Sequence, residues 1–162
     1  MNPEIDDRTV AYVVAAQPVF EDLRQVAAQL AGMLVLSATG AKTAAPDHPM
    51  LATAAQVFDR AADAVERARS SVTDRARPHH DHLVRAASSL RDAIAATRLE
   101  LARAGAAADL EVPLRPLRHA YECLQHAASA LPGFQMVAFD QGCCGSVRLK
   151  ADATPAMTPN RT

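Results

Sequence analysis

Hydrophobic side chains recur along this sequence with the spacing of amphipathic helices. Between residues 51 and 72, large apolar residues return every seven positions, and alanine stands three places after each of the first three: Leu51, Phe58, Val65 and Val72, with Ala54, Ala61 and Ala68. This spacing places the apolar residues on one narrow stripe of a helix. We predict that the helix begins at "PDHP", with Asp47 as its N-cap and Pro49 in its first turn.

Three further segments show the same periodicity. They run from about residue 6 to 40, from "RPHHDH" to residue 105, and from about residue 113 to 131. Pro18 falls inside the first of them. Because proline removes one backbone hydrogen bond, we predict a continuous helix that is kinked there, and a division into two helices stays open. We expect the prolines at 113 and 116 to lie in the first turn of the last helix.

Four helices with short connectors predict an all-α fold. The connectors "GAKTAAPDHP", "TDRARPH" and "GAAADLEVP" are too short to run back along a helix, so consecutive helices should be antiparallel. We predict an up-down-up-down four-helix bundle in a single domain at residues 1–147. The segment "GFQMVAF" holds two of the four phenylalanines and should pack on one end of the bundle. Residues 148–162, with low hydrophobicity and two prolines, should form a disordered tail.

Charge and hydropathy narrow the partners that this bundle can have. The formal net charge is -1, and no basic run could follow a phosphate backbone, so we expect no nucleic-acid partner. The longest apolar run, residues 27–40, is shorter than the roughly 20 residues that cross a bilayer, so we expect no membrane segment. The acidic N-terminal sequence "MNPEIDDRTVAYVV" is unlike a secretory signal. We therefore predict a cytoplasmic protein whose three cysteines are free thiols.

The motifs of several enzyme classes are missing from the sequence. It has no G-x-S-x-G, no glycine-rich phosphate loop and no C-x-x-C. A di-iron bundle needs Glu-x-x-His pairs, and none of Glu21, Glu66 and Glu100 is followed three positions later by histidine. We therefore favour a function without catalysis.

One candidate metal site lies on the last predicted helix. Helical spacing places His119, Glu122 and His126 on one face, with Cys123 beside them. Imidazole, carboxylate and thiolate are ligands of zinc and copper. We expect this face to point to solvent or to a partner, because it lies opposite the leucine stripe. The alternative is an ordinary polar surface with a His–Glu pair one turn apart.

A second candidate metal site follows from the antiparallel topology. The third helix begins at the end of the bundle where the fourth helix stops and "FDQGCCG" follows. The candidate zinc or copper ligands at this end are Cys143, Cys144, His126, His79, His80 and His82. Other interpretations stay open: a strained, redox-active disulfide between the adjacent cysteines, or buried thiols beside a polar helix start.

These patterns favour a protein that binds or assembles through its helical surfaces. Alanine-rich stripes admit a second chain as easily as the same chain, which predicts a homo-oligomer or a helical protein partner. The alternative is a metal-binding or thiol-redox protein that uses Cys143 and Cys144 with the nearby histidines. A third hypothesis is a small-molecule pocket under "GFQMVAF", for which the sequence offers no polar anchor.

Overall fold

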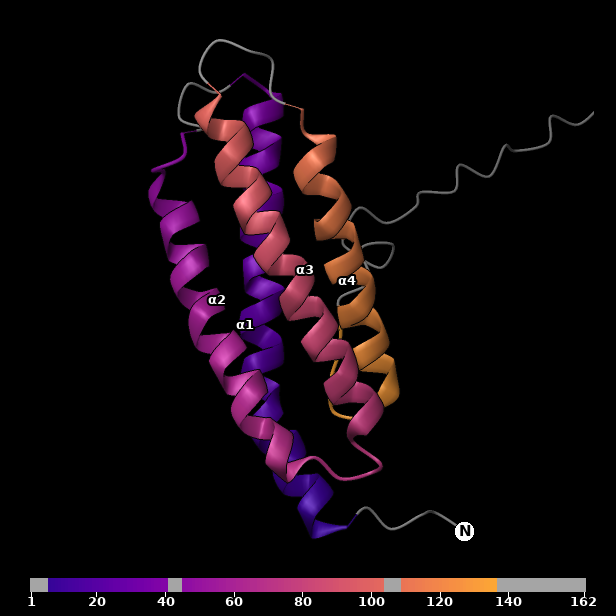
Figure 1. The fold of residues 1–162 in the computed structure, drawn as a ribbon. Helices are drawn as coiled ribbons and strands as arrows, with labels where there is room; N and C mark the ends of the chain where they lie inside the picture. The colour runs from indigo at the N-terminus through magenta and orange to yellow at the C-terminus, as the bar shows by residue number, and fades with distance from the viewer. Residues whose placement is uncertain (1–5, 41–44, 104–108, 137–162) are drawn as a thin grey trace, which may run out of the picture.

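The computed structural model describes residues 6–40, 45–103 and 109–136, and most of these residues are helical. Figure 1 shows four α-helices and one short 3-10 helix: α1 (Asp7–Ala38), α2 (Pro49–Ala68), η1 (Arg69–Ser71), α3 (Arg77–Ala102) and α4 (Glu111–Ala130). These described residues contain no strand. The predicted all-α class is confirmed.

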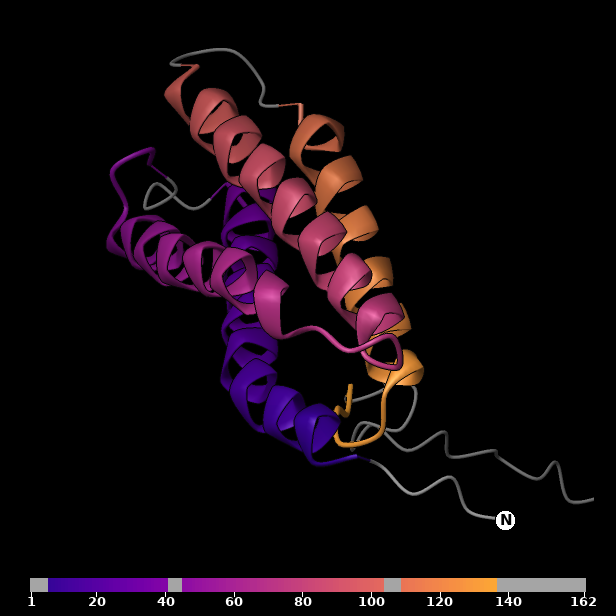
Figure 2. The same cartoon turned by 60° about the horizontal axis from the view of Figure 1, so that its bottom comes forward.

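The helices alternate in direction along the chain, as the short connectors predict. The closest pair is α3 with α4, and the next is α1 with α2. Both views place α3 and α4 side by side, and Figure 2 shows α1 and α2 on the other side of the bundle. Contacts between α1 and α4 are much sparser than those within either pair. The antiparallel bundle is thus confirmed, and it consists of two close pairs with a looser junction between α1 and α4.

The ends of α1 follow from local chemistry. Asp6 is the N-cap: its carboxylate accepts hydrogen bonds from the Thr9 backbone N–H at 2.9 Å and from the Thr9 hydroxyl at 2.7 Å. These bonds lower the pKa of the Asp6 carboxyl. The helix continues through Pro18, which excludes a division into two helices. Pro18 is exposed, so water can satisfy the carbonyl group that loses its partner there.

Three local predictions were wrong. The N-cap of α2 is His48 and not Asp47, because Pro49 is already the first helical residue; His48 Nδ1 accepts from the Met50 N–H at 3.1 Å. Pro116 lies beyond the first turn of α4, because that helix begins earlier than predicted, at Glu111. Val72 lies outside α2, because η1 replaces the last predicted turn, but it still packs against the core.

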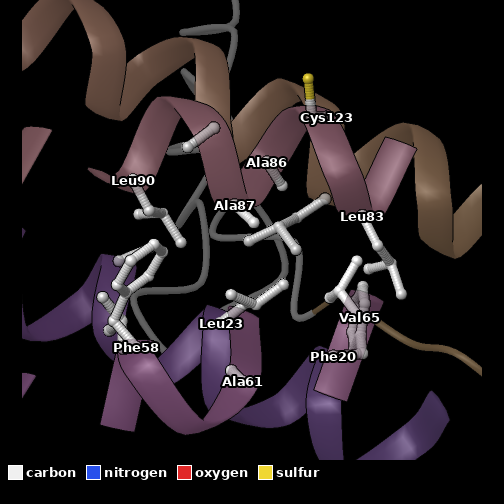
Figure 3. Packing of buried hydrophobic residues seen from close by; sticks show 14 of the residues in the cluster. Phe20, Leu23, Phe58, Ala61, Val65, Leu83, Ala86, Ala87, Leu90 and Cys123 are labelled. Atoms are coloured by element: carbon white, nitrogen blue, oxygen red, sulfur yellow. The ribbon is translucent and has the colours of Figure 1, made fainter. Parts of the chain in front are cut away.

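The core lies between the helix pairs and combines large side chains with alanine. Phe20 and Leu23 of α1 are fully buried, and Figure 3 shows them pointing toward Leu83 of α3 and Ala61 of α2. Ala86 of α3 is also fully buried. Because alanine occupies little space, the helix backbones can approach closely at these positions. This agrees with the narrow stripes predicted from the sequence.

The chain after α4 turns back onto one end of the bundle. Gly133 has φ 102°, a conformation that favours glycine, and places Phe134 against the core. Phe134 is buried and packs edge-to-face on Phe20 at 5.3 Å between ring centroids. This confirms the predicted packing of "GFQMVAF" for its described part, residues 133–136. The rest of the predicted domain, to residue 147, and the predicted tail, 148–162, lie outside the described residues.

Two leucines of α3 provide a test of this core. We expect Leu90→Ala to lower the free energy of unfolding by about 2–5 kcal/mol, because Leu90 is fully buried and its removal leaves a cavity. Leu99→Ala is the control, because Leu99 is 55% exposed, and it should change stability by no more than about 0.5 kcal/mol. Urea unfolding followed by circular dichroism measures both. Equal losses in the two variants would contradict the assigned core.

Candidate functional site

The histidines at the start of α3 divide between the core and the surface. His79 and His80 are buried, whereas His82 is half-buried. His79 Nδ1 lies 2.9 Å from the Tyr12 hydroxyl, and the two share a hydrogen bond that joins α3 to α1. Neither Tyr12 nor its contact with His79 was anticipated from the sequence, because the two residues are distant along the chain.

Aromatic rings surround the imidazole of His79. Its ring centroid lies 4.0 Å from that of Phe134, 5.7 Å from that of Tyr12 and 6.4 Å from that of Phe20. Among the described residues, His79 Nε2 has no hydrogen-bond partner. Burial lowers the pKa of His79 to about 4, and the neighbouring histidines add to this shift. At neutral pH, His79 is therefore a neutral ring packed at the end of the bundle.

His80 lies in a similar environment on the neighbouring side of α3. Its ring meets Tyr12 edge-on at 6.3 Å, and its Nδ1 has no hydrogen-bond partner. Burial lowers the pKa of His80, against the opposing charges of Asp81 and Glu66. Tyr12 is likewise buried, and this raises the pKa of its hydroxyl. These two rings extend the packed aromatic group around His79.

His82 and His126 come together across α3 and α4, as the topology predicts. Their ring centroids are 5.2 Å apart. His82 Nδ1 is buried and has no hydrogen-bond partner in the part of the chain that the structure describes, and burial lowers the pKa of this histidine. His126 is exposed, so the pair can be reached from solvent. Two imidazoles provide half of the four ligands that zinc takes in its usual tetrahedral sites.

No complete metal site is formed by the described residues. Within residues 6–40, 45–103 and 109–136, no group of three or more histidine, cysteine, aspartate or glutamate side chains could hold a metal ion. Cys143 and Cys144, the other predicted ligands, lie outside these ranges. The zinc or copper site that combines them with the histidines stays a prediction.

The other predicted metal-binding cluster lies on α4, and its residues differ in burial. His119 and Glu122 lie on the surface as expected, with 60% and 64% of their side chains exposed and 3.8 Å between Nδ1 and Oε2. The placement of Cys123 on a solvent-facing surface was wrong, because Cys123 is only 3% exposed. It lies between Ala120 and Ala127, which widen the buried stripe beyond the leucines.

The buried thiol of Cys123 is a poor metal ligand at neutral pH. Its Sγ lies 3.8 Å from His119 Nε2, but burial raises the pKa of the thiol. Zinc and copper bind the thiolate, which a raised pKa makes scarcer. Cys123 thus belongs to the packing of the bundle, and it is the one cysteine that the described residues include.

A large apolar groove lies between α1 and α4, where the helix pairs are loosely joined. Its volume is about 650 Å³. We call it the α1–α4 groove, and its lining includes Ala27, Ala28 and Ala31 of α1, Leu114, Leu117 and Tyr121 of α4, and Met136. The predicted pocket under "GFQMVAF" shares Met136 with this groove. The prediction did not include α1 and α4, the two helices that form the groove.

Charged groups along the groove already have partners. Arg24 Nη2 pairs with Glu21 Oε2 at 2.6 Å, and Arg24 Nη1 donates to the Gln135 carbonyl at 3.4 Å. Arg118 pairs with Glu111 at 3.6 Å. The groove therefore presents an apolar floor with paired charges beside it, which suits an apolar occupant better than a charged small molecule.

Exposed apolar residues also lie toward both ends of α1. Val10, Val14 and Val35 are 46%, 68% and 63% exposed, and Ala28 and Ala31 are exposed too. Apolar surface on a helix is usually buried against other parts of the protein or against a partner. The apolar residues of α1 were the signal in the sequence that could have indicated this surface.

Comparison with known proteins finds no matching protein family, no matching curated protein and no matching solved structure. None of the described helices is long and apolar enough to cross a membrane.

Acidification should destabilise the fold through His79. Its pKa falls from the usual 6.5 to about 4 on folding, so between these values the unfolded chain binds more protons than the folded chain. The free energy of unfolding should therefore decrease as the pH falls through this range, by at most about 3 kcal/mol from this residue. Urea unfolding at several pH values measures the slope.

His79→Gln isolates this contribution, because glutamine stays neutral across the whole range. The variant should lose stability with acidification less steeply than the parent chain, whatever its stability at neutral pH. His119→Gln is the control, because the His119 side chain is 60% exposed, and its slope should match that of the parent. An unchanged slope in His79→Gln would show that another group causes the acid sensitivity.

Proposed function

We propose that this chain is a non-catalytic assembly protein that binds a helix of a protein partner in the α1–α4 groove. The observation that carries this proposal is the groove of about 650 Å³, floored by alanine and leucine, together with the exposed apolar residues toward both ends of α1. Exposed apolar surface of this kind marks interaction sites in water-soluble proteins.

The shape of the groove favours a helix as the occupant. Ala28 and Ala31 project little from α1, so the axis of a bound helix can approach to the usual packing distance of about 8–10 Å. Leu114 and Leu117 of α4 supply the opposite wall. An amphipathic helix that places apolar residues three and four positions apart in this groove would cover both walls at once.

Photo-crosslinking at Ala28 tests the proposal. A photoreactive phenylalanine analogue at this exposed groove position should form an adduct in the native cells, and mass spectrometry should locate the attachment on an amphipathic helix. Ala52 is the control: it is also exposed and helical, but it lies on α2 away from the groove. The same analogue there should give no adduct above background.

The identity of the adduct decides the outcome. Attachment to the apolar side of a helix, whether from another protein or a second copy, supports the proposal. Equal labelling from Ala28 and Ala52 would contradict it. Attachment from Ala28 to residues 137–162 of the same chain would also contradict it, because the groove would then be filled by the chain itself.

A second candidate function is zinc or copper binding. The observation that favours it is the His82–His126 pair, with ring centroids 5.2 Å apart and His82 Nδ1 without a hydrogen-bond partner. Metal-ligating histidine pairs need two free ring nitrogens that face one ion. Cys143 and Cys144 follow in the sequence and are the thiol ligands that this proposal adds.

Zinc titration of the full-length, reduced chain tests this candidate. We expect one zinc ion per chain, with the affinity lowered by at least about tenfold in His126→Ala, because a ligand is lost. His119→Ala is the control on the same helix and should leave the affinity unchanged. Absence of zinc binding to the parent chain, or an equal loss in the two variants, would exclude a site at the His82–His126 pair. Isothermal titration calorimetry measures each affinity.

A further inference from the structure

One stripe of residues runs along the exposed side of α1 at alternating spacings of four and three. We call it the outer stripe, and it consists of Val10, Val14, Gln17, Glu21, Arg24, Ala28, Ala31 and Val35. All of these residues are exposed except Arg24, which is half-buried. This alternation of four and three is the pattern of the heptad repeat of helices that pair as a coiled coil. The stripe is apolar toward both ends of α1 and polar in the middle.

The outer stripe is complementary to itself when its direction is reversed. The midpoint of α1 lies between residues 22 and 23, and a two-fold axis there pairs positions equally distant from it. These pairs are Val10 with Val35, Val14 with Ala31, Gln17 with Ala28, and Glu21 with Arg24. Apolar residues thus meet at both ends of the stripe, and an acidic residue meets a basic one at the centre. This order of layers is compatible with an antiparallel coiled coil, in which polar residues at the interface fix register and partner choice.

The same axis brings Val14 of one chain to the groove of another. Ala28 and Ala31 line the α1–α4 groove, and under this symmetry they face Gln17 and Val14 of the second copy. Val14 is the most exposed large apolar residue among those described, at 68%. Figure 1 shows α1 on the far side of the bundle from the viewer, with its first turns projecting beyond the other helices.

We propose that the chain forms a two-fold symmetric homodimer in which α1 pairs antiparallel with α1 of the second copy. This deepens the proposed function and rests on it, because it names the second copy as the helix that enters the groove. Glu21 already pairs with Arg24 of its own chain at 2.6 Å. In the dimer the two Glu21–Arg24 pairs meet at the axis and form one network of four charges. Both copies use the same surface, as a closed two-fold interface requires.

Sedimentation equilibrium of the full-length chain tests the dimer. We expect a dimer at micromolar concentration, and a dissociation constant raised by at least about tenfold in Val14→Asp, which places a charge in an apolar layer of each half. Leu99→Asp is the control, because Leu99 is also largely exposed, at 55%, but lies on α3. Circular dichroism should show the parent helix content in both variants, because neither side chain belongs to the core.

Charge reversal tests the central pair. Glu21→Arg places an arginine against Arg24 of the second copy, at both symmetry-related contacts, and should weaken the dimer. Adding Arg24→Glu restores opposite charges across the axis and should recover the parent dissociation constant to within a few-fold. A dimer that is insensitive to Glu21→Arg and to Val14→Asp would overturn the proposal, since the interface would then lie elsewhere.

Cysteine crosslinking tests the antiparallel direction. With Cys143 and Cys144 replaced by serine, Val14→Cys combined with Ala31→Cys should give a covalent dimer on mild oxidation. Val14→Cys alone should not, because in the antiparallel dimer the two residues at position 14 are about 26 Å apart along the axis. Crosslinking of the single variant would show a parallel arrangement and overturn the proposal.

The proposed dimer and the proposed function can fail separately. A chain that stays monomeric at all concentrations, while Ala28 crosslinks to a helix of another protein, overturns the dimer and leaves the proposed function intact. A monomer whose Ala28 forms no helical adduct overturns both.

Discussion

The close approach that alanine allows between helices governs much of this structure. Ala61, Ala86 and Ala120 are buried where helices meet, and they bring α3 against α4 and α1 against α2. Helices packed in this way leave little room for adjustment, because interiors are filled as densely as crystals. The space that remains lies where α1 and α4 meet only partly, and there Ala28 and Ala31 face outward without a covering helix. Both the close packing in the core and the open groove beside it therefore follow from the alanine residues of these helices.

The end of the bundle at which α3 begins is stabilised by a different interaction. His79 takes a core position that an aliphatic residue could fill, and it gains a hydrogen bond to Tyr12 and ring contacts with Phe134. One side chain thereby joins α1, α3 and the segment after α4. The buried ring has to stay neutral to remain there, because a buried imidazolium without a counterion is unfavourable. The stability of this end of the bundle is therefore tied to the protonation state of its buried histidines, His79 and His80.

Periodicity in the sequence was sufficient to predict the four helices, and the connector lengths were sufficient to predict their antiparallel order. The same topology correctly placed His82 near His126. It failed for Cys123, because the leucine stripe alone understates the width of the buried face. The ring contacts of His79 and the α1–α4 groove were out of reach for a physical reason. Periodicity shows which side of a helix is apolar, but the gap between two helices depends on side chains from both.

The contact between Phe20 and Phe134 also has a consequence for the order in which the chain folds. These two rings lie 5.3 Å apart, yet more than a hundred residues separate them in the sequence. During synthesis, α1 leaves the ribosome long before its aromatic partner exists, so α1 and α2 can pair early while this end of α1 stays uncovered. Contacts between distant residues slow folding, because a long loop must close before they form. The apolar surface of α1 is thus exposed for most of the time that the ribosome needs to make the chain, and that interval is when an unwanted association is easiest.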